Sequence, residues 1–159
     1  MEIIMNNNTN NKKVLKRLRT IFAENTDKRI CVVGVSCTGK STLLRDLPEC
    51  LDGDNIVWDT LPEDVYKRLS CSPTPWDEET LNIWKEWYIK TDFDIKPGQP
   101  LFSVWVEDCD LVVYLTLSEN EYLKRVAMRG RNLEDMLKQR QELDKVVREC
   151  NLPVIIVKL

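Results

Sequence analysis

The feature that most constrains how this chain can fold is a glycine-rich segment between two apolar ones. Residues 34–41 read Gly-Val-Ser-Cys-Thr-Gly-Lys-Ser, which matches the pattern Gly-x-x-x-x-Gly-Lys-Ser. The apolar run 30–33 comes directly before it, and leucines at 43, 44 and 47 lie on one side of a helix predicted over 41–47. Buried strand, tight turn and helix in this order form the opening unit of an α/β fold.

The loop itself predicts a site for the phosphates of ATP with Mg²⁺. Its backbone N–H groups can point inward and form a concave anion site. Gly39 lets the backbone approach a phosphate, Lys40 is expected to bridge the β- and γ-phosphate oxygens, and Ser41 is expected to place its hydroxyl on Mg²⁺. The candidate ATP-binding residues are Gly34, Val35, Ser36, Cys37, Thr38, Gly39, Lys40, Ser41 and Thr42.

Strand-like and helix-like segments alternate along the rest of the chain. Short apolar runs predict further strands at 55–58, 111–115 and 153–157, and helical spacing predicts helices at 12–24, 118–128 and 133–147. Between them, 62–69 and 77–88 are predicted as helices, 88–93 as an alternative strand and 100–108 as a short helix. Such alternation predicts an α/β three-layer sandwich with a parallel sheet of about five strands.

The chain is expected to form one domain. It has 159 residues and no internal repeat, so residues 12–159 are predicted to fold as a unit. Residues 1–11 are rich in asparagine and are predicted to be a flexible lead-in. The amphipathic helix predicted over 12–24 could serve as a homodimer contact or as a brace.

The composition excludes several classes of function. The chain has no histidine, which removes Ser-His-Asp and Cys-His catalysis and the zinc sites that need imidazole. Its net charge is -3, so no extended nucleic-acid surface is expected. The six cysteines show no Cys-x-x-Cys spacing and predict free thiols in a cytoplasmic protein. No apolar run approaches the roughly 18 residues of a membrane span.

Two parts of the chain, about residues 29–59 and 108–158, resemble the deoxynucleoside kinase and thymidylate kinase group of P-loop kinases. The resemblance rests on the loop, on Asp-Leu-Val-Val-Tyr-Leu at 110–115, on the helix 118–126 and on Arg-Gly-Arg at 129–131. It implies a kinase-type P-loop NTPase fold with a lid at about 125–135. Arg125, Arg129 and Arg131 would then face the ATP phosphates, where the arginine fork stabilises the transferring group.

Acidic side chains supply the candidates for proton transfer and for the magnesium shell. Asp59 directly follows the strand predicted at 55–58, so it is expected at the carboxyl edge of the sheet, where a catalytic acid of such kinases lies. A helix N-cap is the simpler alternative. Asp92 is the second candidate, as a magnesium ligand, if 88–91 is a strand. Glu107 and Asp108 form a third option, for which a polar turn is an equally good explanation.

Three functions remain open from the sequence. The first is Mg-dependent transfer of a phosphoryl group from ATP to a small-molecule acceptor, a nucleoside or nucleoside monophosphate. The second is a kinase of another small metabolite, similar to shikimate or gluconate kinases. The third is a regulatory protein that binds a nucleotide with little turnover. The five tryptophans crowd residues 58–105 and could stack on a nucleobase, although core packing is their commoner role.

Overall fold

The computed structural model describes the backbone of residues 2–159 and the side chains of residues 10–159. Its centre is one sheet of five parallel strands in the order β2-β3-β1-β4-β5. The strands are β1 (Ile30–Val33), β2 (Leu51–Asp52), β3 (Leu101–Ser103), β4 (Leu111–Thr116) and β5 (Val154–Lys158). The strand that precedes the glycine-rich loop is therefore the middle strand, with partners on both sides.

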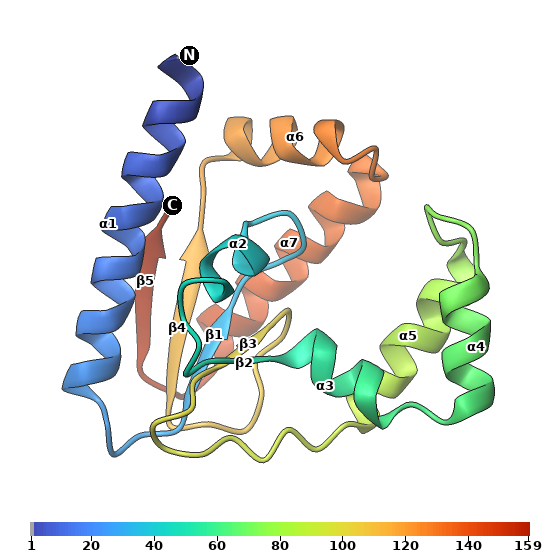
Figure 1. Ribbon diagram of the computed structural model, residues 1–159, viewed down its shortest axis with the longest axis horizontal. Coiled ribbons are helices and arrows are strands. Elements are labelled where there is room, and N and C mark those ends of the chain that lie inside the picture. Colours follow the sequence, from blue (N-terminus) through green and yellow to red (C-terminus); the bar gives the residue numbers. More distant parts are fainter. Residues whose placement is uncertain (1) are drawn as a thin grey trace.

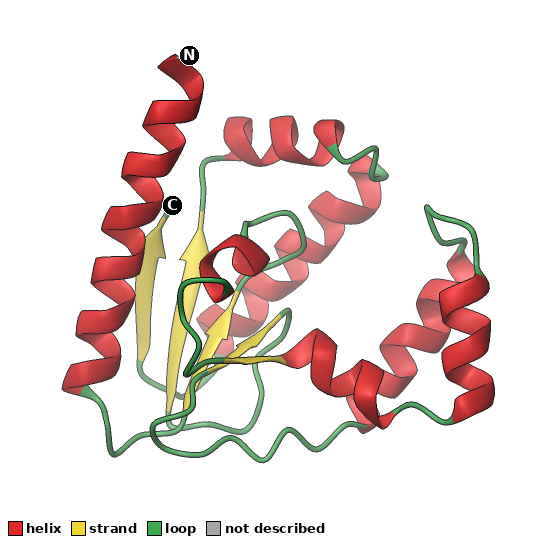
Figure 2. Ribbon diagram, in the orientation of Figure 1, coloured by secondary structure: helices red, strands yellow, loops and turns green. Residues whose placement is uncertain are grey.

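Helices flank both faces of the sheet (Figures 1 and 2). They are α1 (Glu2–Glu24), α2 (Lys40–Leu44), α3 (Gly53–Thr60), α4 (Glu63–Cys71), α5 (Glu78–Lys90), α6 (Glu119–Met128) and α7 (Leu133–Glu149). The arrangement confirms the predicted α/β class and the parallel five-stranded sheet, and it is compatible with a three-layer sandwich.

One face of the sheet is covered by α1 and α2. Leu18 and Ile21 of α1 are buried together with Leu47, Val32 and Val113. A leucine fully removed from water contributes about 1.5–3 kcal/mol, so α1 is part of the core. The helix begins at Glu2, earlier than the predicted residue 12, and includes most of the segment that was predicted as a lead-in.

The other face is covered mainly by α5, α6 and α7. Tyr122 of α6 and Leu143 of α7 are buried against Val33 and Val112 of the sheet. The Tyr122 hydroxyl donates to the Met136 carbonyl at 3.2 Å and thereby joins α6 to α7. Both helices agree with the predicted segments, because each has a side-chain N-cap. Ser118, for example, accepts from the Glu121 N–H at 3.3 Å.

The sequence prediction fails between β2 and β4. Residues 55–58 belong to helix α3, because the Asp52 carboxylate caps a helix directly after β2 by accepting from the Asp54 N–H at 3.0 Å. Residues 88–90 end helix α5, so no strand forms at 88–93. The predicted helix at 100–108 is instead β3 followed by a loop, since Leu101 and Phe102 are buried between β1 and β2.

None of the helices described over residues 2–159 combines the length and the apolar character that crossing a bilayer requires.

Glu107, in the loop between β3 and β4, is expected to make stability depend on pH. Burial raises the pKa of its carboxyl to about 7, while in the unfolded chain it titrates near its ordinary value. Folding therefore favours the protonated form, and stability falls as pH rises from about 5 to about 8. Between these pH values the free energy of unfolding should fall by about 1–2 kcal/mol less in Glu107→Gln than in the wild type. This figure allows for the solvent that still reaches the half-buried side chain. Urea unfolding at both pH values tests this; an equal benefit at both would contradict it.

Candidate functional site

The glycine-rich loop leaves β1 at the carboxyl edge of the sheet and leads into α2. The Gly34 N–H donates to the Ser103 carbonyl of β3 at 3.2 Å, and the Thr38 hydroxyl donates to the Val35 carbonyl at 2.8 Å. A Cβ at residue 34 would lie 2.9 Å from Thr38 Oγ1. The first glycine of the motif is thus required because the loop folds back over it.

Two residues of the loop have left-handed backbone conformations. Cys37 has φ 71° and Gly39 has φ 97°. Left-handed residues among right-handed ones are typical of backbone turns that can direct successive N–H groups toward an anion. Helix α2 spans only five residues, shorter than the predicted 41–47. A helix this short offers little helix dipole, so any attraction for phosphate would have to come from the loop and the nearby cations.

Lys40 lies at the centre of this arrangement. Its ammonium donates to the Gly34 carbonyl and, at 2.9 Å, to the Val35 carbonyl. Burial lowers its pKa to about 8, while the negative charges of Asp54 and Asp52 act in the opposite direction. The side chain therefore carries a partly desolvated positive charge beside two carboxylates.

If the loop binds ATP, as its motif predicts, the pKa of Lys40 sets how the affinity should depend on pH. A triphosphate stabilises the charged ammonium, so binding above about pH 8 requires uptake of a proton and weakens as pH rises. Between about pH 7 and about pH 9.5 the affinity for Mg·ATP should fall about tenfold. Calorimetric titration at several pH values measures this. Lys40→Arg should flatten the profile, since arginine stays charged; an unchanged slope in that variant would assign the effect to another group.

Arg125 of α6 reaches the loop directly. Its Nη1 donates to the Thr38 carbonyl at 2.8 Å, and its Nε donates to Glu121 at 3.3 Å. Arg129, at the end of α6, is near enough for its charge to lower the pKa of Lys40. The structure thus brings Arg125 and Arg129 toward the loop. Arg131 lies one residue beyond Gly130, is exposed, and has no contact that joins it to the loop among the described hydrogen bonds and ion pairs.

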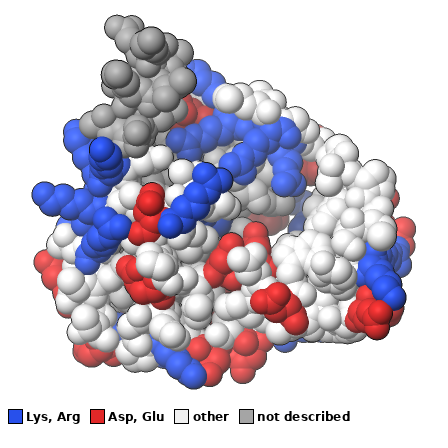
Figure 3. Space-filling model, viewed as in Figure 1, with Lys and Arg blue, Asp and Glu red and all other residues white. Residues whose placement is uncertain are grey.

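Figure 3 shows the charges of this face divided into regions. Lysine and arginine side chains gather across its upper part, in the region of α6, and acidic side chains lie below them. A groove-like hollow separates the α6–α7 corner from the α4–α5 pair. The site therefore has a cationic side and an acidic side.

The acids nearest to Lys40 are Asp52 and Asp54, which the sequence analysis missed. Asp52 ends β2 and Asp54 opens α3. Burial and the charge of Asp52 raise the pKa of Asp54, while Lys40 lowers it. A Cβ at Gly53 would lie 2.8 Å from the Tyr88 hydroxyl and 2.9 Å from the Phe102 carbonyl. Asp-Gly-Asp after an apolar residue was the signal that could have identified this turn.

The predicted acids do not lie at the ends of strands. Asp59 does not follow a strand; it is exposed near the end of α3. Asp92 also does not follow a strand; it comes after α5 and accepts from the Asp94 N–H at 3.1 Å. The premises for assigning catalysis to Asp59 and magnesium to Asp92 are therefore wrong. Asp108 pairs with Arg29 at 3.1 Å, next to the start of β1, at the edge of the sheet opposite the loop.

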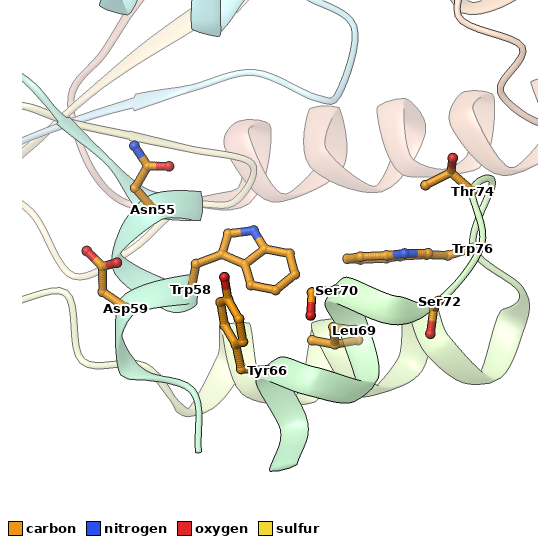
Figure 4. A pocket seen from close by; sticks show the side chains of 9 residues that line it. All are labelled: Asn55, Trp58, Asp59, Tyr66, Leu69, Ser70, Ser72, Thr74 and Trp76. Carbon is orange, nitrogen blue, oxygen red and sulfur yellow. The ribbon is translucent and has the colours of Figure 1, made fainter. Parts of the chain in front are cut away.

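A cavity of about 450 Å³ opens along α3, the helix that follows Asp52 (Figure 4). It lies between α3, α4 and the loop that joins α4 to α5. Its aromatic walls are Trp58, Tyr66 and Trp76, with 5.6 Å between the ring centroids of Trp58 and Tyr66 and 6.1 Å between those of Trp58 and Trp76. The remaining lining residues are Asn55, Asp59, Leu69, Ser70, Ser72 and Thr74.

A second cavity, of about 300 Å³, lies between α6, α7 and the end of β4 and includes Val35 and Thr38 of the loop. Its cations already have protein partners. Arg140 donates to the Leu117 carbonyl at 3.0 Å and lies over the Tyr122 ring, and Arg148 pairs with Asp144. We therefore regard it as a gap beside the loop and not as a separate anion site.

The residues of the site fit Mg²⁺ that is bound together with a nucleotide. Over the described part of the chain, no three Cys, Asp or Glu side chains are placed to hold a metal ion. Mg²⁺ bound with a nucleotide needs few protein ligands, because phosphates and waters complete its octahedron. Ser41, at the exposed start of α2, can supply the hydroxyl that this requires.

Comparison with known proteins adds no relative. No protein-family model matches the chain, and no curated protein matches it significantly.

Proposed function

We propose that this protein transfers the γ-phosphoryl group of Mg·ATP to a nucleoside or nucleoside monophosphate. The observation that carries the proposal is the position of Lys40. It lies at the end of a loop with left-handed residues after the middle strand of a parallel sheet, where Arg125 contacts the loop and the charges of Asp52 and Asp54 act on its ammonium. Cations beside a carboxylate are what phosphoryl transfer to a hydroxyl requires.

Each residue has a separate task in this proposal. The loop N–H groups and Lys40 hold the β- and γ-phosphates, and Arg125 and Arg129 neutralise charge on the transferring group. The Ser41 hydroxyl holds Mg²⁺, which draws charge from the phosphate oxygens. Asp54 accepts the proton of the attacking hydroxyl. Its raised pKa suits this task, because a base works best when its pKa lies nearer to the working pH.

One observation favours a second candidate, a nucleotide-binding regulatory protein with little turnover. In P-loop NTPases an aspartate from a second motif commonly joins the loop Ser or Thr in holding Mg²⁺. Here β3 ends in Ser103, whose hydroxyl is buried and lies 2.8 Å from the Tyr88 hydroxyl. A weaker magnesium shell would slow transfer more than it weakens binding.

The test is ADP formation from Mg·ATP in the presence of nucleosides, nucleoside monophosphates or small hydroxy acids. The proposal expects ADP to form at a rate that depends on a nucleoside or nucleotide acceptor. Transfer only to hydroxy acids would indicate a kinase of another metabolite. Tight ATP binding without acceptor-dependent ADP formation would contradict transfer and support the regulatory candidate.

A further inference from the structure

We propose that the cavity lined by Trp58, Tyr66 and Trp76 is the acceptor subsite and that it selects an unphosphorylated nucleoside over the nucleoside monophosphate. This inference rests on the proposed function, because it takes the loop at residues 34–41 as the ATP side of the same site. The charges of the described residues distinguish the two acceptor classes, nucleosides and nucleoside monophosphates.

The walls of the cavity suit a flat, uncharged ligand. Trp58 comes from α3, Tyr66 from α4 and Trp76 from the loop that follows α4, and Figure 4 shows their rings gathered around one space. Tyr66 has 49 % of its surface exposed, although an aromatic side chain of this size is usually covered. A volume of about 450 Å³ is ordinary for a small-molecule site. Aromatic rings stack on any nucleobase through its π-face.

The polar lining suits ribose hydroxyls and base edges. Asn55 offers an amide, and Ser70, Ser72 and Thr74 offer hydroxyls. Amides and hydroxyls both donate and accept, so they can pair with uncharged polar groups on either a base or a sugar. A ligand with a flat ring and several hydroxyls would therefore be held on both its apolar and its polar parts.

The charge of the cavity opposes a phosphorylated ligand. Its nine lining residues, all within the described part of the chain, include one carboxylate, Asp59, and neither lysine nor arginine. A phosphate dianion would require cationic partners on entering such a site. The cations that the structure brings together, Lys40, Arg125 and Arg129, lie at the loop, where the triphosphate of ATP would use them.

The chain that connects the cavity to the surroundings of Lys40 is also acidic. Asn55 lines the cavity, and Asp54 is the preceding residue. The charges of Asp52 and Asp54 both act on Lys40, so these carboxylates lie near its ammonium. A hydroxyl that meets these carboxylates can give up its proton, whereas a phosphate that meets them is repelled.

Phosphoryl transfer to the bound nucleoside forms one bond to the γ-phosphorus and breaks another. The acceptor hydroxyl transfers its proton to the Asp54 carboxylate as its oxygen bonds to the γ-phosphorus of ATP. The bond between the γ-phosphorus and the bridging oxygen breaks, and ADP leaves with that electron pair. The products are a nucleoside monophosphate and ADP, and the proton on Asp54 passes to solvent.

The test is calorimetric titration of the whole protein with adenosine, guanosine, cytidine and thymidine, each compared with its 5′-monophosphate. At least one nucleoside should bind, and its monophosphate should bind at least about tenfold more weakly. Trp76→Leu should weaken the nucleoside about tenfold or more. Trp105→Leu, a tryptophan with 40 % exposure outside the cavity, should stay within about twofold. Tyr66→Ser gives a second test if Trp76→Leu fails to fold.

Equal or tighter binding of the monophosphate would overturn the charge argument. Absence of nucleoside binding, or binding that neither Trp76→Leu nor Tyr66→Ser weakens, would overturn the assignment of the cavity. The proposed function has its own separate readout. Lys40-dependent ADP formation with monophosphates alone would keep phosphoryl transfer while rejecting this inference, and absence of Mg·ATP binding would reject the proposed function whatever the nucleosides do.

Discussion

Replacing Lys40 with alanine should lower acceptor-dependent ADP formation by about a hundredfold to a thousandfold, the usual loss when one charged group that stabilises a transition state is removed. The half-buried ammonium of Lys40 donates to the loop carbonyls of Gly34 and Val35, and bound phosphates would replace these carbonyls as its partners. Steady-state kinetics at saturating acceptor measure the effect.

A matched lysine supplies the control for this prediction. Lys90 is exposed at the end of α5 and pairs with Glu86 at 2.6 Å, so Lys90→Ala should leave turnover within about twofold, as surface ion pairs contribute little. Circular dichroism should show both variants folded. Turnover in Lys40→Ala equal to that in Lys90→Ala would remove Lys40 from the mechanism.

Asp54→Asn should lower turnover by about a hundredfold to ten-thousandfold, the range expected when a general base is lost. The asparagine side chain keeps the size of aspartate but cannot accept the proton of the attacking hydroxyl. The affinity for Mg·ATP should change little, because the substitution removes no donor from the phosphates. Rapid-quench measurement of a single turnover, together with calorimetric titration of Mg·ATP, separates these two effects.

Asp92→Asn is the control for the base. It makes the same chemical change at an acid whose carboxylate caps the Asp94 N–H after α5, so turnover should stay within about threefold. If Asp54→Asn kept full activity while Asp92→Asn lost it, Asp54 would be rejected as the base and Asp92, which the sequence analysis named as a magnesium ligand, would have to be placed in the site.

Much of the fold could be predicted because its signals are local. The motif at 34–41 sets a strand before it and a turn within it, and the apolar runs at 111–115 and 153–157 have no competing helical period. The helices α6 and α7 carry their own N-caps at Ser118 and Asn132. In each case neighbouring residues decide the structure, and the sequence alone contains that information.

The stretch from β2 to β3 could not be predicted because tertiary contacts decide it. Residues 55–58 have strand-like composition, yet Asp52 caps a helix there and Val57 becomes buried on one helical face. β3 has only three residues, and its partners β1 and β2 lie far away in the sequence. This shift moved the expected catalytic acid from Asp59 to Asp54.

The candidate site was predicted unevenly for the same reason. Lys40 and Ser41 come from a motif of fixed spacing, and Arg125 was expected from the resemblance of residues 118–126 to the kinase group. Arg129 is brought toward the loop only because α6 crosses the carboxyl edge of the sheet (Figure 1). The aromatic cavity depends on the packing of α3 against α4 and their connecting segments, which no short pattern in the sequence encodes.

The central claim is that the loop at residues 34–41 binds the triphosphate of Mg·ATP, and calorimetric titration of the wild-type protein with Mg·ATP tests it most directly. The account predicts saturable binding with one site per chain, weakened at least about tenfold in Lys40→Ala and in Ser41→Ala and unchanged in Lys90→Ala. Absence of binding to the wild type, or equal binding to wild type and Lys40→Ala, would contradict it.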